Sequence, residues 1–302
     1  MTRRRILVVL VLVSAAGLAA ALAAAQLLGD DESPSKPRIA APPPDSKRSA
    51  TVWAVGDGAD GGDRAKRVAD MIARSRPDRL LYLGDVYDQG TADEFERNYR
   101  SVYGRFDAIT APTPGNHDWP RHEEGYDPYW DKANPRLPQN RHWYSFKLAG
   151  WEFLSLNSEE RHADGTPQVR WAEQAVSEPG TCRIAFWHRP FMNAGRHGDQ
   201  ADVEPLWNAV RDHAALVITG HDHNMQHFKP TEGMVQLISG AGGKEFYSSN
   251  QDDPRLVWDE DDVAGALRLD LRRGLARFRF VGEDGKTLHR GRVRCRPLRT
   301  TG

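Results

Sequence analysis

From residue 50 onward, short apolar runs alternate with amphipathic stretches, and this pattern predicts strands separated by helices. Apolar runs typical of buried strands lie at 51–55, 79–83, 108–111, 183–187, 215–219 and 235–238. Apolar residues at helical spacing predict helices at 64–75, 95–103, 166–176 and 205–213, and Thr91 with Glu94 forms a capping-box pattern before the second of these. Segments 142–146 and 151–156 predict a hairpin, and 264–271, 276–281 and 288–293 predict a strand-rich end. The polar segment 121–141 predicts a loop. Together these elements indicate a layered α/β or α+β domain.

The N-terminal segment has a different character. Three arginines at positions 3 to 5 precede a nearly unbroken apolar run over residues 6–28. A membrane-spanning helix needs about 20 such residues, whereas a secretory signal has a shorter apolar core before small residues. We therefore expect residues 1–28 to be an N-terminal signal peptide or membrane anchor, and the length of the run favours the anchor. The arginines favour a cytoplasmic N-terminus, with the rest of the chain extracytoplasmic and either membrane-anchored or secreted.

Residues 29–49 are rich in proline, small residues and charged residues. Such a segment buries too little apolar surface to order itself, so it reads as a disordered linker. The folded domain is therefore expected over residues 50–297.

Charge and cysteine content narrow the function classes. The 302-residue chain has 41 Lys and Arg against 42 Asp and Glu, a net charge of −1, which gives no electrostatic argument for a nucleic-acid partner. The two cysteines, Cys182 and Cys295, lack the CxxC spacing of a zinc–thiolate site. They can form a disulfide in an oxidising compartment or remain unpaired, and the sequence does not decide between these states.

Polar clusters directly follow five of the predicted strands. They are Gly56-Asp57, Gly84-Asp85-Val86-Tyr87-Asp88, Gly115-Asn116-His117-Asp118, Trp187-His188-Arg189-Pro190 and Gly220-His221-Asp222-His223. Loops at the carboxyl ends of parallel strands meet at one edge of a sheet, so we expect one composite site. Carboxylate, amide and imidazole groups suit Fe, Mn or Zn, and two such ions can activate water and clamp a phosphoryl group in transfer.

The order D…GDxxD…GNHD…H…GHxH resembles the calcineurin-like metallophosphoesterases, within them the purple acid phosphatase-like secreted branch, over roughly residues 50–243. The resemblance implies a four-layer αββα sandwich of two mixed β-sheets flanked by helices. It also implies two metal ions and hydrolysis of a small-molecule phosphate ester by metal-bound hydroxide. The implied metal ligands are Asp57, Asp85, Asn116, His188, His221 and His223, with Asp85 bridging both ions, Asp57 and His223 on the first ion, and Asn116, His188 and His221 on the second. The implied catalytic pair is His117, as the proton donor to the leaving group, and Asp88, as the carboxylate that orients it, while Asn116 and His197 would contact substrate.

One position departs from the family pattern. Most members carry a histidine two residues after the first aspartate, where this chain has Ala59. Purple acid phosphatases also lack that histidine and use the tyrosine of GDxxY, but here Asp88 occupies that position and the tyrosine is Tyr87. On this basis we expect the first metal ion to be under-liganded, weakly held or completed by water, since Tyr87 would reach it only through a local shift of the loop. His197 has a second interpretation, as a solvent-exposed loop histidine.

The resemblance makes a phosphomonoesterase of the acid phosphatase kind the leading functional hypothesis. A phosphodiesterase is the first alternative. The missing histidine supports another, a catalytically weakened, membrane-tethered protein that binds a phosphorylated ligand.

Overall fold

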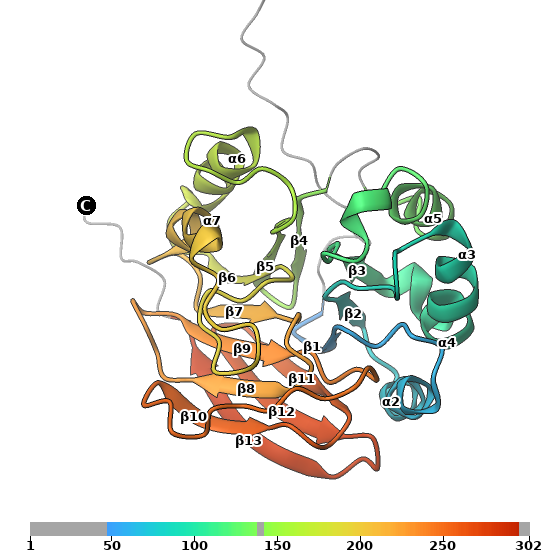
Figure 1. Ribbon diagram of the computed structural model, residues 1–302. Coiled ribbons are helices and arrows are strands. Elements are labelled where there is room, and N and C mark those ends of the chain that lie inside the picture. The colour runs from blue at the N-terminus through green and yellow to red at the C-terminus, as the bar shows by residue number, and fades with distance from the viewer. Residues whose placement is uncertain (1–46, 138–141, 296–302) are drawn as a thin grey trace, which may run out of the picture. The chain divides into compact units, whose positions relative to one another are not determined.

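Two mixed β-sheets pack face to face and form the frame of the structure (Figure 1). The computed structural model describes residues 47–137 and 142–295, which belong to one compact unit of the chain. The predicted segment 1–28 and all but the last three residues of the predicted linker 29–49 lie outside the described residues. The first strand within the described residues begins at Ser49.

The first sheet has six strands in the order β13-β12-β11-β1-β2-β3. Strands β1, β2 and β3 run parallel, whereas β11, β12 and β13 are antiparallel. Their bounds are β1 Ser49–Val55, β2 Arg79–Tyr82, β3 Thr110–Pro112, β11 Gly265–Arg272, β12 Leu275–Gly282 and β13 Thr287–Arg294.

The second sheet has seven strands in the order β10-β8-β9-β7-β6-β5-β4. Strands β5, β6, β7 and β9 are parallel, and β4, β8 and β10 pair antiparallel at the two ends. Their bounds are β4 Tyr144–Leu148, β5 Trp151–Ser155, β6 Cys182–Phe186, β7 Leu216–Thr219, β8 Met225–Phe228, β9 Val235–Ser239 and β10 Leu256–Glu260.

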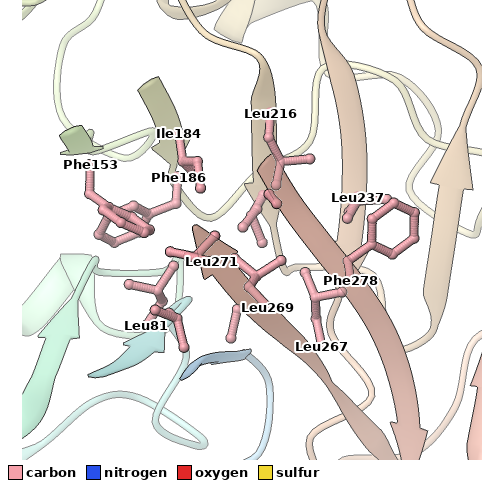
Figure 2. Close-up of a cluster of buried hydrophobic side chains, with 14 of the residues drawn as sticks. Leu81, Phe153, Ile184, Phe186, Leu216, Leu237, Leu267, Leu269, Leu271 and Phe278 are labelled. Carbon is pink, nitrogen blue, oxygen red and sulfur yellow. The ribbon is translucent and has the colours of Figure 1, made fainter. Parts of the chain in front are cut away.

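The main core lies between the two sheets (Figure 2). Alternation along β11 points Leu267, Leu269 and Leu271 inward, while the intervening Arg268 and Asp270 are only half-buried. The leucines meet the buried side chains of the opposite sheet, among them Phe153, Phe186 and Leu237. The apolar face of each sheet is therefore buried against the other.

Helices cover the outer face of each sheet. One apolar cluster joins the first sheet to α2 Asp63–Arg74, to the continuous helical stretch of α3 Ala92–Glu94, η1 Phe95–Arg100 and α4 Ser101–Tyr103, and to η2 Gly104–Ile109 and α5 Tyr126–Ala133. Another joins the second sheet to α6 Pro167–Val176 and α7 Glu204–Val210, and a 3₁₀ turn, η4 Ala201–Val203, directly precedes α7. Thr91 and Glu94 form the predicted capping box. The four-layer αββα sandwich expected from the sequence is confirmed.

Several elements differ from the sequence-based prediction. The segment 121–141, expected to be a loop, contains α5, and a 3₁₀ turn, η3 Trp119–Arg121, begins just before it. The short strands β8 and β10 were also not predicted. β8 begins two residues after the last polar cluster, and β10 is a half-exposed edge strand with acidic residues, which resembles a loop in composition.

The two cysteines form a disulfide. It joins the first residue of β6 to Cys295, which directly follows β13 and is 113 residues further along the chain. The disulfide therefore links the two sheets at one end of the sandwich.

Candidate metal centre

Five loops at the carboxyl ends of parallel strands carry the candidate site. Asp57, Asp85 and Asn116 follow β1, β2 and β3 of the first sheet, whereas His188 and His221 follow β6 and β7 of the second. Asp57, Asp85 and His221 have positive φ angles of 60°, 70° and 72°, a conformation that costs non-glycine residues energy and that clusters at functional sites. The predicted composite site is thus assembled from both sheets.

One group of side chains surrounds the hydroxyl of Tyr87. This oxygen lies 3.0 Å from Asp57 Oδ1, 3.2 Å from Asp85 Oδ2 and 2.9 Å from His223 Nε2. Tyr87 is not among the metal ligands predicted from the sequence, because Asp88 stands at the position expected for a ligand tyrosine. The structure instead brings Tyr87 into contact with the two residues expected to hold the first ion, so that group includes a third candidate ligand.

A second group forms around the imidazole of His188. Its Nε2 lies 3.0 Å from Asn116 Oδ1, 3.1 Å from His221 Nδ1 and 3.5 Å from Asp85 Oδ2. Its Nδ1 lies 2.7 Å from the carbonyl oxygen of Leu83. Because a carbonyl only accepts, Nδ1 carries the hydrogen, and the Nε2 lone pair faces the cluster.

Asp85 belongs to both groups, since its Oδ2 faces Tyr87 in one and His188 in the other. The loop that carries it is braced by Asp118. The buried Asp118 carboxylate accepts hydrogen bonds of 2.8–2.9 Å from the backbone N–H groups of Asp85, Val86 and Gly115. Asp118 therefore acts as a loop-capping residue, and Asp85 has the placement of a bridging carboxylate.

The electrostatics of the two groups fit a pair of cations. Asp57 and Asp85 are fully buried, and burial, followed by repulsion from Asp85, raises the pKa of Asp57 well above its ordinary value. Burial lowers the pKa of His223 to about 4 and that of His221 further still, so both imidazoles are neutral near pH 7. Within the described residues, the ion-pair partners of Asp57 and Asp85 are all histidines. Crowded carboxylates and neutral imidazoles are the donor set that Fe, Mn or Zn ions bind.

His117 lies at the edge of this centre, but Asp88 does not orient it through its carboxylate. The His117 Nδ1 donates to the backbone carbonyl of Asp88 at 2.6 Å. The Asp88 side chain is exposed and its carboxylate pairs with Lys244 Nζ at 2.9 Å. The expected carboxylate–histidine pair is therefore corrected to a carbonyl–histidine pair.

His197 reaches the same centre from the loop after β6. Its ring stacks on His221 with centroids 4.2 Å apart, and its Nδ1 lies 2.9 Å from Oδ1 of the fully buried Asp222. Its side chain is 33% exposed. The structure thus favours the site interpretation of His197 over that of a free loop histidine.

Residues 50–225 match the family model for calcineurin-like phosphoesterases. The match extends over more than half of the chain and includes every candidate ligand described above. The chain belongs to the calcineurin-like phosphoesterase family.

The curated relatives include purple acid phosphatases and a probable phosphodiesterase. Purple acid phosphatase 7 of Arabidopsis thaliana is 28% identical over 114 residues, which cover 36% of this chain and 34% of that protein. A probable cyclic nucleotide phosphodiesterase of Synechococcus is 23% identical over 188 residues, 58% of this chain and 68% of that protein. The match therefore spans about a third of the first of these relatives.

Two solved structures share the fold. The purple acid phosphatase PPD1 from yellow lupin seeds superposes with a TM-score of 0.68 at 16% identity, over 84% of this chain and 55% of that one. GAP50, the anchor in the inner membrane complex of Plasmodium, superposes with a TM-score of 0.68 at 15% identity, over 83% of this chain and 90% of that one. Both likenesses confirm the calcineurin-like sandwich.

Three residues of this phosphoesterase site were absent from the predicted set. Tyr87 and Asp222 are described above, and Tyr247 stacks on His223 with centroids 4.0 Å apart. Asp222 lies inside a recognised motif, and its position between His221 and His223 was a usable signal in the sequence. Tyr247 lies outside every motif and is brought to the site only by the fold.

No helix within residues 47–137 and 142–295 is both long and apolar enough to cross a membrane. The predicted N-terminal anchor or signal lies outside these residues and stays a prediction.

Proposed function

We propose that this protein is a metal-dependent hydrolase that cleaves phosphate esters at a dinuclear centre, with phosphomonoesters as its preferred substrates. The observation that carries the proposal is the buried Asp85 carboxylate, which lies between two sets of candidate ligands. The first set is Asp57, Tyr87 and His223, and the second is Asn116, His188 and His221.

The two ions, Fe, Mn or Zn, would supply Lewis-acid charge and would lower the pKa of a bound water molecule toward neutrality. The protein side chains would fix their positions, because His188 and His223 each have Nδ1 tied to a backbone carbonyl at 2.7 Å. Held in this way, each ring presents Nε2 to the centre without needing to reorient.

Proton transfer to the leaving group is assigned to His117. The carbonyl of Asp88 holds the Nδ1 hydrogen, so Nε2 is the nitrogen that gains and loses a proton. This nitrogen lies 4.0 Å from Asp85 Oδ2, beside the place where the phosphate would bind, and the His117 side chain is 37% exposed and open to substrate. His197, with its Nδ1 held by Asp222, is assigned to contact the phosphate from the other side.

A phosphodiester is the second candidate substrate. The longest of the curated alignments described above, over 188 residues, is with a probable cyclic nucleotide phosphodiesterase. The third hypothesis, a weakened phospho-ligand-binding protein, rested on the lack of a third ligand for the first ion. Because Tyr87 stands beside that position, the ground for this hypothesis is weaker.

An extracytoplasmic location is also part of the proposal. The Cys182–Cys295 disulfide supports it, because structural disulfides persist in oxidising compartments. Association with a membrane through residues 1–28 stays a prediction from the sequence.

The decisive experiment compares hydrolysis of p-nitrophenyl phosphate and bis-p-nitrophenyl phosphate by the full chain, first metal-free and then with added Mn, Fe or Zn. Asn116→Ala should abolish the metal-dependent turnover, whereas Asn208→Ala, a change of an exposed asparagine on α7, should preserve it. A preference for the monoester supports the leading proposal, and a preference for the diester selects the second candidate. A folded, metal-loaded protein without turnover on either ester would refute general phosphoesterase activity.

A further inference from the structure

A second cluster of metal-ligand side chains lies outside the dinuclear centre. It consists of His122, which directly follows η3, Asp127 in the first turn of α5, and His142, two residues before β4. His122 Nδ1 lies 2.9 Å from Asp127 Oδ2, and His142 Nε2 lies 2.8 Å from Asp127 Oδ1. One ligand atom from each residue falls within 4.8 Å of the other two. No residue of this cluster takes part in the proposed phosphoesterase chemistry.

The packing around these side chains is typical of a built ligand set. The indole of Trp119 stacks on His122 with centroids 4.1 Å apart and contacts His142 edge-on at 4.7 Å. His142 Nδ1 lies 3.4 Å from Glu160 Oε2. A histidine that binds metal through one nitrogen usually has its other nitrogen held by a carboxylate or carbonyl, and Glu160 has that position for His142.

The exposure of the cluster suits exchange of an ion with solvent. The side chains of His122, Asp127 and His142 are 23%, 21% and 14% exposed. They are shielded enough to be ordered, yet an ion can reach them. Two imidazoles and one carboxylate match the nitrogen and oxygen donors of Zn²⁺ sites that keep one open position.

We propose that His122, Asp127 and His142 form a mononuclear site for a divalent transition metal ion of the Zn²⁺ class, separate from the dinuclear centre. The three ligands come from three chain segments, so a bound ion would tie the start of α5 to the segment before β4. His122 also lies only a few residues beyond Asn116 and His117 in the chain. The ion would therefore stabilise the region that follows the third strand-end loop of the main site.

A metal-free alternative accounts for part of the same geometry. A protonated His142 can lie between the carboxylates of Asp127 and Glu160 as an ion-pair network. That network does not require His122, whose Nδ1 also points at Asp127. Direct measurement of bound metal separates the two states.

The experiment uses the full chain, stripped with a chelator and equilibrated with Zn²⁺ at micromolar free concentration. Bound zinc per chain is then measured by mass spectrometry of the separated protein. The double variant His122→Gln/His142→Gln should bind one zinc equivalent less than the wild type. The matched variant His213→Gln/His289→Gln, which also removes two partly buried imidazoles, should bind as much as the wild type. Equal zinc in all three proteins would overturn the proposal.

Two further measurements keep the test decisive. In Asp85→Asn, designed to disable the dinuclear centre, the zinc equivalent that depends on His122 and His142 should persist. This site therefore stands or falls independently of the phosphoesterase proposal. If the double variant does not fold, zinc-edge anomalous diffraction from wild-type crystals decides. A peak bonded to His122 and His142 supports the site, and peaks confined to the dinuclear centre reject it.

Discussion

The substitution Tyr87→Phe tests whether the tyrosine hydroxyl completes the first metal position. The change removes one oxygen that lies 2.9–3.2 Å from Asp57, Asp85 and His223. It keeps the buried ring, which packs against His117 with centroids 4.7 Å apart. The variant therefore changes the ligand set without opening a large cavity.

The expected magnitude follows from the number of ligands. Apart from the bridging Asp85, the first ion would have Asp57, Tyr87 and His223 as its protein ligands. Loss of an outer-shell partner already costs 10–100-fold in metal affinity, so loss of a direct ligand should cost about 100-fold or more, about 2.8 kcal/mol of binding free energy. In the metal-free protein the lost hydrogen bond to a buried carboxylate should lower the free energy of unfolding by about 1.5–3 kcal/mol.

Calorimetric titration of the metal-free protein resolves the two ions. Wild type should take up two tightly bound ions at this centre, whereas Tyr87→Phe should keep the ion held by Asn116, His188 and His221 and bind the other weakly. Tyr247→Phe is the matched control. It also removes a tyrosine hydroxyl, while the ring that stacks on His223 is retained. Wild-type affinity for both ions in Tyr87→Phe would show that the hydroxyl is not a ligand.

Three further predictions concern other parts of the chain. Asp88→Asn should leave turnover within about threefold of wild type, whereas His117→Asn should lower kcat by about 10²–10⁴-fold, because the Asp88 backbone carbonyl and not its side chain holds His117. Cys182→Ser should lower the free energy of unfolding by about 2–4 kcal/mol in denaturant melts, since it opens a closed loop that spans 113 residues to Cys295, and an unchanged midpoint would contradict this. Burial raises the folded-state pKa of Asp107 to about 6. Asp107 therefore holds its proton more tightly in the folded protein than in the unfolded chain. The stability that this proton contributes is lost as the pH rises from about 4 through 6. Asp107→Asn should therefore gain stability relative to wild type across that range, and parallel pH profiles would refute the assignment.

The sequence pattern predicted most of the strands because they are buried and carry a distinct apolar signal, whereas the four-layer arrangement was implied by the family resemblance. The parallel strands β1, β2, β6 and β7 read as short apolar runs since both of their faces are covered. Helix α5 was missed because proline and charged residues dilute its apolar face, although Tyr126 and Trp130 are buried. Its order depends on tertiary packing, which periodicity alone does not register.

The order of motifs at strand ends identified the candidate ligands. It did not predict the direction in which the side chains of these loops point. Asp88 occupies the position where a ligand tyrosine was expected, yet its carboxylate turns outward to Lys244 while Tyr87, one residue earlier, turns inward. A shift of one residue in a loop reverses which side chain faces the centre, and only the backbone path decides it.

Ala59 gives a physical reason for this exchange. It stands where the family pattern implied by the resemblance has a histidine, and its small side chain is fully buried beside the strand-end loop, where its backbone pairs with Val86. That pairing sets the path of the chain just before Tyr87, whose N–H donates to the Ala59 carbonyl at 2.9 Å. The alanine at position 59 and the inward turn of Tyr87 are therefore parts of one local arrangement, so Ala59→His should interfere with Tyr87 and not simply add a ligand.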